Sequence, residues 1–317
     1  MVPPKSAKKT TALVLGGGAA RGFAHVGLLD VLDANGVKFD MIVGTSMGAM
    51  IGGLYAAGIP VSEIERSVVD MPWKRLLQYF RPDLKNGGLI TGRSIVRALE
   101  ALLGDADIAS FKTPFAAVAA DVLTGEKVVF RSGNAVTAIR ASISIPGTFA
   151  PVLCNGRVLV DGGIREPVPV PTAREMGATI AVACNVLDHP AKRVYAGKWA
   201  SMDSRLKECA PSRRKAAENG GWYDRLAALA QTVSRRRKER RRARGRAPWI
   251  GTVVWHSWLI QQYSLSEYQT READFLIEPP LGDMLPSEFP RGREAVRAGR
   301  IAAEAALPAI KKLLAGG

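Results

Sequence analysis

The chain has 317 residues, of which 47% are hydrophobic and 23% charged, a composition typical of a globular protein with a large buried core. This composition excludes intrinsic disorder, collagen-like repeats and a small disulfide-bonded scaffold. The three cysteines form an odd set without a CxxC or Cys/His ligand spacing, so neither a disulfide framework nor a zinc or other metal site is expected. This cysteine usage favours a reducing, cytoplasmic location.

The net charge of +15 is concentrated in one segment. Residues 191–249 contain 18 Lys and Arg against 5 Asp and Glu, which accounts for +13 of the total. The rest of the chain is nearly neutral, unlike a protein that coats nucleic acid over its whole surface. We therefore do not expect nucleic acid to be the main partner.

The N-terminal region reads as a flexible segment, residues 1–10, followed by an apolar run that is too short for a secretory signal. No A-x-A cleavage site follows, and glycines interrupt the apolar run after five residues. The uncharged residues 41–62 are long enough to cross a bilayer, but they fit a buried strand, a sharp turn and a buried helix better. We expect neither a signal peptide nor a transmembrane helix.

The first sixty residues alternate between strand and helix patterns. Residues 11–15 are a short apolar run that ends in three glycines, and residues 20–35 show helical periodicity up to an Asn-Gly stop. Residues 40–44 predict a second buried strand, and residues 47–57 predict a helix rich in small side chains. This alternation predicts a parallel α/β sheet.

Later segments continue the pattern. Further helices are predicted at residues 62–69, 92–103, 249–263 and 293–314, further strands at 157–160, 179–186 and 274–277, and a hairpin at 115–122 and 127–131. The basic residues 189–248 interrupt the alternation of strands and helices, because their hydrophobic periodicity is weak. They predict a partly disordered insertion. We expect one catalytic domain formed by residues 11–188 and 249–317, with residues 61–86 as a plausible lid.

A G-x-S-x-G pentapeptide lies between the second predicted strand and the second predicted helix, the context that this motif requires. Gly44 and Gly48 flank Ser46 and remove Cβ atoms that would clash between strand and helix. The turn exposes the serine hydroxyl at a helix N-terminus, where negative charge is stabilised. Ser46 is therefore a candidate nucleophile, and the alternative is a Gly-rich connection with an incidental serine.

A serine nucleophile needs a neighbouring base to take its proton. Asp161 follows a predicted strand and precedes Gly162 and Gly163, which permit close approach of another backbone. We predict Asp161 as the base, although the same pattern also fits an ordinary turn. Asp121 is a competing carboxylate that the adjacent Leu-Thr-Gly-Glu explains as a hairpin residue.

The histidines are poorer candidates for a Ser-His-Asp triad. His25 lies on the first predicted helix and precedes the serine. His189 opens the basic insertion, and His256 lies in an aromatic helix where a packed histidine is the commoner outcome.

Gly16, Gly17 and Gly18 form another loop from a strand into a helix, followed by Arg21 and Gly22. Arg21 stands where a dinucleotide fingerprint would need glycine, and no G-K-[ST] of a P-loop follows. Exposed backbone N–H groups at a helix start can bind an anion, as an oxyanion hole does. Two roles are open for Arg21: fixing the loop, or binding a substrate phosphate.

The Gly-rich loop, the G-x-S-x-G elbow and the Asp-Gly-Gly turn, in this order, resemble the patatin-like phospholipase family. The resemblance covers residues 12–187, including 140–152 before the aspartate, and resumes at about residue 249. It implies a three-layer α/β/α sandwich around a mostly parallel sheet. It also implies hydrolysis of lipid acyl esters without a metal or cofactor, by a dyad of Ser46 and Asp161 with Gly16 to Gly18 as the oxyanion hole. At Ala19 the chain departs from the fourth glycine of many members.

If the substrate is a lipid in an anionic surface, that surface attracts the basic run from Arg235 to Arg246. Tryptophans favour the headgroup region of such a surface, and Trp249, Trp255 and Trp258 follow the run. Peripheral membrane contact is then one hypothesis, beside a solvated insertion with core tryptophans and RNA binding by the arginine-rich run. Two other functions stay open: a non-lipid esterase or thioesterase, and a regulatory or nucleic-acid-binding protein on a hydrolase scaffold. The sequence carries no signal for the oligomeric state.

Overall fold

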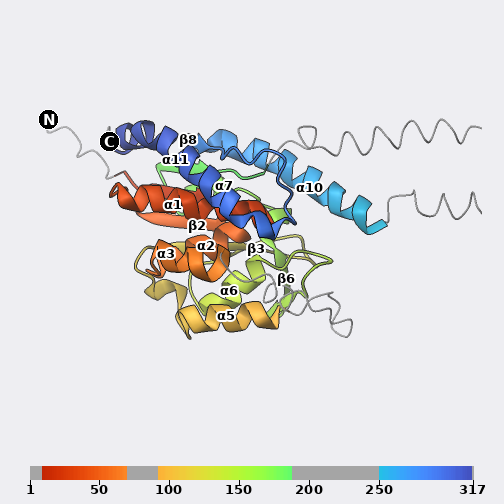
Figure 1. Ribbon diagram of the computed structural model, residues 1–317. Coiled ribbons are helices and arrows are strands. Elements are labelled where there is room, and N and C mark those ends of the chain that lie inside the picture. Colours follow the sequence, from red (N-terminus) through yellow and green to blue (C-terminus); the bar gives the residue numbers. More distant parts are fainter. Residues whose placement is uncertain (1–8, 70–91, 188–249, 316–317) are drawn as a thin grey trace, which may run out of the picture. The chain divides into compact units, whose positions relative to one another are not determined.

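A computed structural model describes residues 9–69, 92–187 and 250–315 of the protein (Figure 1). The chain divides into two compact units, Met1–His189 with Ile260–Gly317, and Pro190–Leu259. The described part of the second unit is the beginning of helix α10 (Ile250–Gln269), where the rings of Trp255 and Trp258 lie 5.0 Å apart. The basic run and Trp249 lie outside the described residues, as do residues 70–86 of the expected lid.

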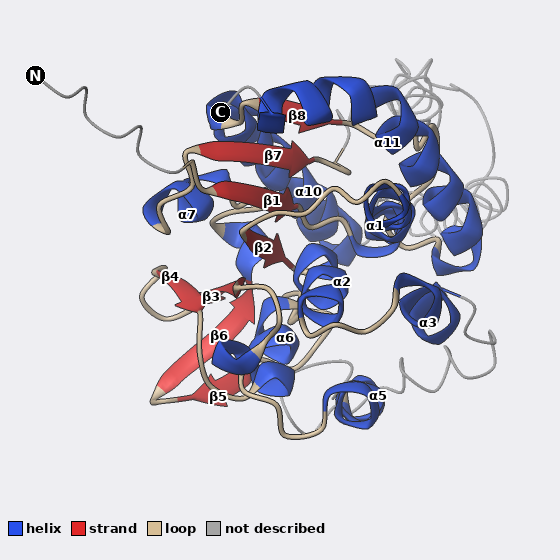
Figure 2. Ribbon diagram, turned by 90° about the vertical axis from the view of Figure 1, so that its left-hand side faces the viewer, coloured by secondary structure: helices blue, strands red, loops and turns tan. Residues whose placement is uncertain are grey.

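The first unit is built on a mixed, mostly parallel sheet, with eight strands in the described residues (Figure 2). The parallel strands are β1 (Thr11–Leu15), β2 (Met41–Thr45), β3 (Phe115–Asp121), β7 (Ile180–Cys184) and β8 (Phe275–Ile277). The antiparallel strands are β4 (Lys127–Phe130), β5 (Val152–Cys154) and β6 (Arg157–Asp161). The order is β5-β6-β3-β2-β1-β7-β8, and β4 pairs with the free side of β3.

Alternate side chains of the central strands enter two different cores. Leu13 and Leu15 pack in the core formed with helices α1 (Ala24–Ala34), α2 (Met47–Ala56) and α11 (Gly292–Ala315). Ala12 and Val14 pack on the opposite face with α7 (Val170–Glu175). Because successive strand residues point to opposite faces, strands that are apolar throughout require a helical layer on both sides. The predicted three-layer α/β/α architecture is thus confirmed.

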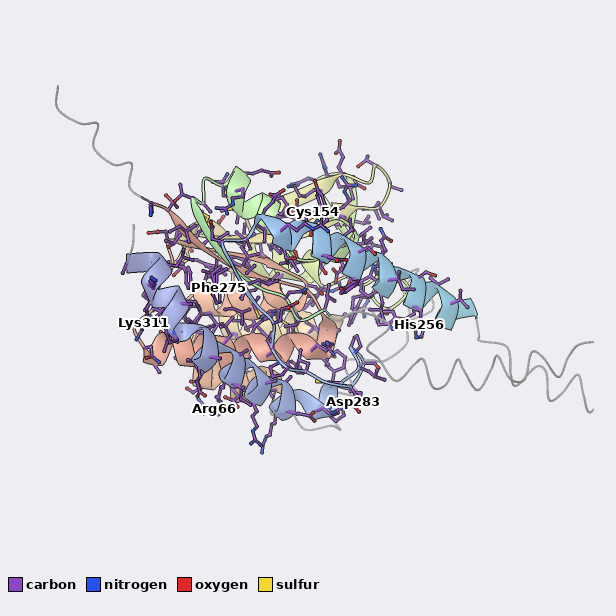
Figure 3. All side chains as sticks on the ribbon, turned by 90° about the horizontal axis from the view of Figure 1, so that it is seen from above. Arg66, Cys154, His256, Phe275, Asp283 and Lys311 are labelled. Atoms are coloured by element: carbon purple, nitrogen blue, oxygen red, sulfur yellow. The ribbon has the colours of Figure 1, made fainter. Side chains whose placement is uncertain are left out.

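Helices α1 and α11 lie side by side because small residues face each other. A Cβ atom at Gly27 would lie 1.9 Å from the Val296 carbonyl oxygen, and one at Gly299 would lie 1.9 Å from the Ala24 carbonyl oxygen. Figure 3 shows α11 extending from near Asp283 to Lys311 along this side of the unit. The last helix of the chain therefore completes the core around the first βα unit.

Several short elements differ from the sequence expectations. The expected helix at residues 20–35 begins with a 3₁₀ segment, η1 (Ala19–Phe23), before α1. Helices α6 (Ala135–Ser142) and α7 and strand β5 were not among the elements expected from the sequence. The Asn134 side chain stabilises the start of α6 by accepting a hydrogen bond from the Thr137 N–H at 2.8 Å.

The remaining helical segments are α3 (Val61–Ile64), the π-helical η2 (Glu65–Val69), α5 (Arg93–Leu103), η4 (Ile108–Ser110), η5 (Gly162–Ile164), η7 (Thr270–Glu272) and η8 (Phe289–Arg291). Within the described ranges, none of the helices combines the length and the apolar character that crossing a bilayer requires.

Candidate active site

Ser46 stands in the turn between β2 and α2 with φ 55° and ψ −122°. A positive φ is strained for a residue with a Cβ atom, and this strain is typical of a nucleophile elbow. The flanking glycines have a steric role, because a Cβ at Gly48 would lie 2.1 Å from the Leu15 carbonyl oxygen and one at Gly44 2.5 Å from the Gly48 carbonyl oxygen. Gly22 leaves room for the Met47 side chain, 2.5 Å from a Cβ placed there.

Asp161, the last residue of β6, contacts Ser46 directly. The Ser46 hydroxyl donates a hydrogen bond to Asp161 Oδ2 at 2.6 Å. Both side chains are buried, with Asp161 0% and Ser46 5% exposed. The structure therefore brings the two residues that the motifs selected into one hydrogen-bonded pair.

The surroundings of Asp161 favour its protonated form. Burial raises the pKa of the Asp161 carboxyl to about 7, although the hydrogen bonds from Ser46 and from the Gly163 N–H act to lower it. The Gly163 N–H donates to Asp161 Oδ1 at 2.7 Å. Gly162 lets this turn pack on β3, because a Cβ there would lie 2.2 Å from the Val118 carbonyl oxygen. A carboxyl group whose pKa lies near 7 is suited to proton transfer at neutral pH.

Ser142 of α6 belongs to the site but was not singled out from the sequence. The Ser46 N–H donates to Ser142 Oγ at 2.9 Å, and the Ser142 hydroxyl donates to the Val118 carbonyl oxygen of β3 at 2.6 Å. Nearby, the Asp161 N–H donates to the Ser144 carbonyl oxygen at 2.9 Å. The available sequence signal was that both serines fall within residues 140–152, the segment that resembles the family.

The Gly-rich loop lies beside the nucleophile, since a Cβ placed on Gly17 would be 3.2 Å from Ser46 Cβ. Two of its N–H groups already donate to main-chain carbonyls: Gly16 to Cys184 at 3.0 Å and Gly17 to Pro167 at 2.8 Å. The N–H groups of Gly18 and Ala19 make no main-chain hydrogen bond to any described residue. Ala19 has φ 49°, a left-handed conformation that favours glycine.

His25 holds the carbonyl group of this loop rather than acting on Ser46. Its Nε2 lies 2.7 Å from the Gly16 carbonyl oxygen, and since a carbonyl only accepts, Nε2 carries the hydrogen. The Nδ1 atom is buried with no hydrogen-bond partner in the part of the chain that the structure describes. Burial lowers the pKa of His25 to about 4, against the raising effect of the Gly16 bond, so the ring is neutral at pH 7.

Arg21 and Asp121 have structural partners. Arg21 is 2% exposed, and its guanidinium donates to the carbonyl oxygens of Val186 at 2.6 Å and Met284 at 2.7 Å. These bonds favour loop fixation over phosphate binding as the role of Arg21. Asp121 Oδ1 accepts from the Leu123 N–H at 3.0 Å, which places this carboxylate in the β3–β4 hairpin.

His256 lies in the second unit, and His189 lies outside the described residues. Among the residues that the structure describes, no cluster of three or more His, Cys, Asp and Glu side chains is arranged to hold a metal ion. A cavity of about 380 Å³ is lined by residues such as Leu13, Tyr55 and Lys112, and neither Ser46 nor Asp161 is among its lining residues.

The family model of the patatin-like phospholipases matches residues 13–174, just over half of the chain. The match contains the Gly-rich loop, the serine elbow and Asp161. The chain belongs to the patatin-like phospholipase family.

The curated relatives share the same region. An uncharacterised NTE family protein of Mycobacterium tuberculosis is 38% identical over 182 residues, which are 57% of this chain and 50% of that protein. Human patatin-like phospholipase domain-containing protein 6 is 33% identical over 184 residues, 56% of this chain and 13% of that protein. Lysophospholipase NTE1 of Yarrowia lipolytica is 32% identical over 180 residues, 55% of this chain and 12% of that protein.

The chain thus spans about half the length of the mycobacterial relative and a smaller share of the other two. Among solved structures, VipD from Legionella pneumophila aligns with a TM-score of 0.46 and 14% identity, covering 95% of this chain and 67% of that one.

Proposed function

We propose that this protein hydrolyses acyl esters of lipids, such as phospholipids and lysophospholipids, with Ser46 as nucleophile and Asp161 as base. The observation that carries the proposal is the 2.6 Å hydrogen bond from the Ser46 hydroxyl to Asp161 at a strained strand-to-helix turn. Family membership supports the reaction class, and one relative is named as a lysophospholipase.

In the first half-reaction, Ser46 Oγ attacks the ester carbonyl carbon while its proton passes to Asp161 Oδ2. The carbonyl oxygen becomes an oxyanion in the tetrahedral intermediate. The intermediate then collapses, the bond to the alcohol breaks, and the proton on Asp161 passes to the departing alkoxide. Ser46 is left acylated, and Asp161 is ionised again.

In the second half-reaction, a water molecule takes the place of the alcohol. Asp161 accepts a proton from this water as its oxygen attacks the acyl carbonyl carbon. Collapse of the second tetrahedral intermediate releases the fatty acid, and the proton on Asp161 returns to Ser46 Oγ. We do not assign His25 as the base, because the Ser46 hydroxyl donates to Asp161 and the His25 Nε2–H donates to the Gly16 carbonyl oxygen.

Within the Gly-rich loop, we assign the oxyanion contacts to the N–H groups of Gly18 and Ala19. The N–H groups of Gly16 and Gly17 already donate to Cys184 and Pro167, and we therefore propose Gly18 and Ala19 in place of the expected set of Gly16, Gly17 and Gly18. A donor of this kind typically contributes about 3 kcal/mol to transition-state stabilisation.

We further propose that residues 11–188 and 249–317 form one catalytic domain and residues 189–248 an insertion. The separate unit Pro190–Leu259 supports an insertion here, although this unit also includes residues 249–259. Peripheral membrane contact through the run from Arg235 to Arg246 and the nearby tryptophans belongs to the same proposal. Its support is the +13 charge of residues 191–249, since each basic residue near an anionic surface contributes about 1 kcal/mol. Flotation with anionic liposomes should decrease when residues 234–246 are deleted, and unchanged flotation would exclude this contact.

The chemical proposal is tested by hydrolysis of a p-nitrophenyl acyl ester and of a fluorogenic phospholipid. Ser46→Ala and Asp161→Asn should each lose at least about 10²-fold in kcat, because a positioned base contributes about 10²- to 10⁴-fold. Asp121→Asn is the matched control, a second buried carboxylate that should retain activity. Full activity in folded Ser46→Ala would exclude the mechanism, and loss only in Asp121→Asn would reassign the base.

A further inference from the structure

The segment that follows Asp161, residues 162–168, contacts the other two motifs of the site through its main chain. The Glu166 carbonyl oxygen accepts a hydrogen bond from Thr45 Oγ1 at 2.7 Å, directly beside the nucleophile. The Pro167 carbonyl oxygen accepts from the Gly17 N–H at 2.8 Å. The alignment of the serine elbow, the Gly-rich loop and Asp161 therefore depends on where these two carbonyl groups lie.

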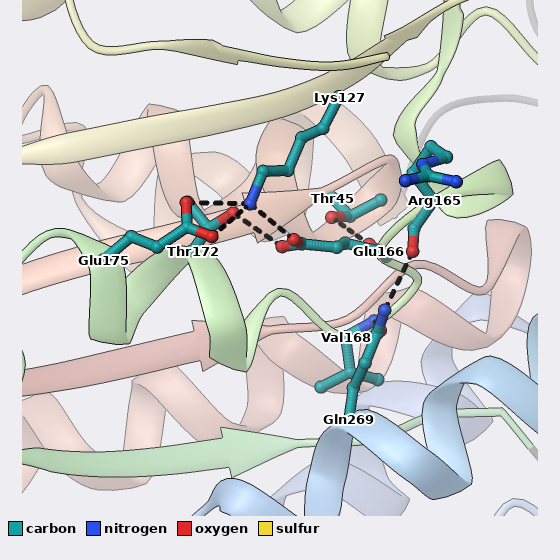
Figure 4. A network of polar contacts seen from close by, with 8 residues as sticks. All are labelled: Thr45, Lys127, Arg165, Glu166, Val168, Thr172, Glu175 and Gln269. Atoms are coloured by element: carbon teal, nitrogen blue, oxygen red, sulfur yellow. Dashed lines mark hydrogen bonds and ion pairs between the residues drawn. The ribbon is translucent and has the colours of Figure 1, made fainter. Parts of the chain in front are cut away.

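The Glu166 side chain anchors this segment to two other elements (Figure 4). Glu166 Oε1 accepts from Lys127 Nζ of β4 at 2.7 Å, and Glu166 Oε2 accepts from Thr172 Oγ1 of α7 at 2.5 Å. Glu166 is only 7% exposed, and a buried carboxylate persists only with such partners. Lys127 also bonds Glu175 at 2.8 Å, but the Glu175 side chain is 61% exposed, and exposed ion pairs contribute little.

Gln269, at the end of α10, holds the same segment from another direction. Its Nε2 donates to the Arg165 carbonyl oxygen at 2.8 Å, and its Oε1 accepts from the Val168 N–H at 3.4 Å. The Gln269 side chain is buried at 5% exposure. Side chains from the sheet, from α7 and from α10 thus fix the main chain on both sides of Glu166 and Pro167.

We propose that Glu166, Lys127 and Gln269 form a positioning clamp that aligns the nucleophile, the Gly-rich loop and the base for ester hydrolysis. The proposal rests on the function proposed above. None of the three residues touches reacting atoms, because each acts through the carbonyl groups of residues 165–167 or through another side chain. Since misplacement of reacting groups by about 1 Å can cost about 10²-fold in rate, a loosened clamp lowers kcat.

The kinetic test compares variants that loosen the clamp with closely matched controls. Lys127→Met keeps the aliphatic stem and removes the ammonium, and we expect about a 10-fold loss of kcat with KM changed by less than about twofold. Glu175→Gln, which alters the exposed partner of the same lysine, should leave kcat unchanged. Thr45→Val should lower kcat, whereas Thr45→Ser retains the hydroxyl donor and should restore it. Wild-type kcat in folded Lys127→Met and Thr45→Val would overturn the proposal.

A second measurement does not require turnover. In protein labelled with ¹⁵N-glycine, amide hydrogen exchange reports on Gly17, which bonds Pro167 in the segment, and on Gly16, which bonds Cys184 outside it. Lys127→Met should accelerate exchange at Gly17 by about 10-fold relative to Gly16, and Glu175→Gln should not. Equal exchange at Gly17 in all three proteins would overturn the clamp. If Lys127→Met accelerates exchange at Gly17 but the wild-type protein hydrolyses no ester, the clamp is retained and the proposed function is excluded.

Discussion

Ser46 and Asp161 approach each other at the ends of two strands that run in opposite directions along the same side of β3. β3 extends three residues beyond Val118, the partner of Thr45 at the end of β2, and β6 pairs with β3 along this extension alone. Because β6 enters from beyond the end of β2, its last residue, Asp161, stops beside the serine. The length of β3 is therefore what lets an antiparallel strand deliver a carboxylate to the carboxyl end of a parallel one.

The pH dependence of hydrolysis should follow the ionisation of Asp161. Only the carboxylate form can accept the serine proton, and burial raises the pKa of Asp161 to about 7. We expect kcat/KM for a soluble p-nitrophenyl ester to rise as the pH increases through about 7 and then to level off. A rate that stays constant from about pH 5 to about pH 9 would contradict a role for Asp161 as the base.

The same carboxyl group should make the protein less stable as the pH rises. The folded-state pKa of Asp161 lies above the unfolded value of 3.8, so its stabilising contribution is complete below the unfolded pKa and is lost as the pH rises through about 7. The Asn side chain of Asp161→Asn does not ionise, so the variant does not lose stability in this way. The melting temperature of the variant should exceed that of the wild type by an amount that grows between about pH 4 and about pH 7. Asp121→Asn serves as the control, and a gap independent of pH would refute the prediction.

His25 should have the opposite linkage. Burial lowers its folded-state pKa from 6.5 to about 4, so its stabilising contribution is present above the unfolded pKa and is lost as the pH falls to the folded pKa. His25→Leu leaves the Gly16 carbonyl without a donor and should cost about 1–3 kcal/mol of unfolding free energy at neutral pH. Denaturant titrations should show this deficit shrinking between about pH 6.5 and about pH 4, and a constant deficit would argue against it.

Ala19 should tolerate substitution by glycine. Its φ of 49° is strained for alanine, and relief of this strain offsets the greater freedom of glycine in the unfolded chain. We expect Ala19→Gly to retain hydrolysis, since the N–H donor remains. The unfolding free energy should stay equal to that of the wild type or increase by up to about 1 kcal/mol. Ala20→Gly, at a neighbour without a positive φ, should instead destabilise by about 0.5–1 kcal/mol. The reverse order of stabilities would show that the loop is unstrained.

The sequence predicted the central elements because their signals are local. An apolar run such as Thr11–Leu15 that ends in glycines indicates a buried strand and a turn, and Gly44 is required by contacts with Gly48 and Ala49 of the same turn. Ser142 of helix α6 gave no such local signal, since its role depends on a hydrogen bond to Ser46, 96 residues away. The periodicity of a sequence carries no information about contacts between residues so far apart in the chain.

By itself, the sequence determined the family motifs, the three-layer architecture and the choice of Ser46 and Asp161 as the pair to examine. The tertiary structure alone decided which loop N–H groups are already engaged, because an N–H of Gly16 or Gly17 is occupied only when a distant carbonyl, of Cys184 or Pro167, lies opposite it. It likewise decided that Glu166 and Lys127, two ordinary surface residue types in the sequence, meet in a nearly buried ion pair. The physical reason is the same in both cases: hydrogen-bond partners and burial are properties of the packed chain, whereas glycine spacing and apolar runs are properties of the local sequence.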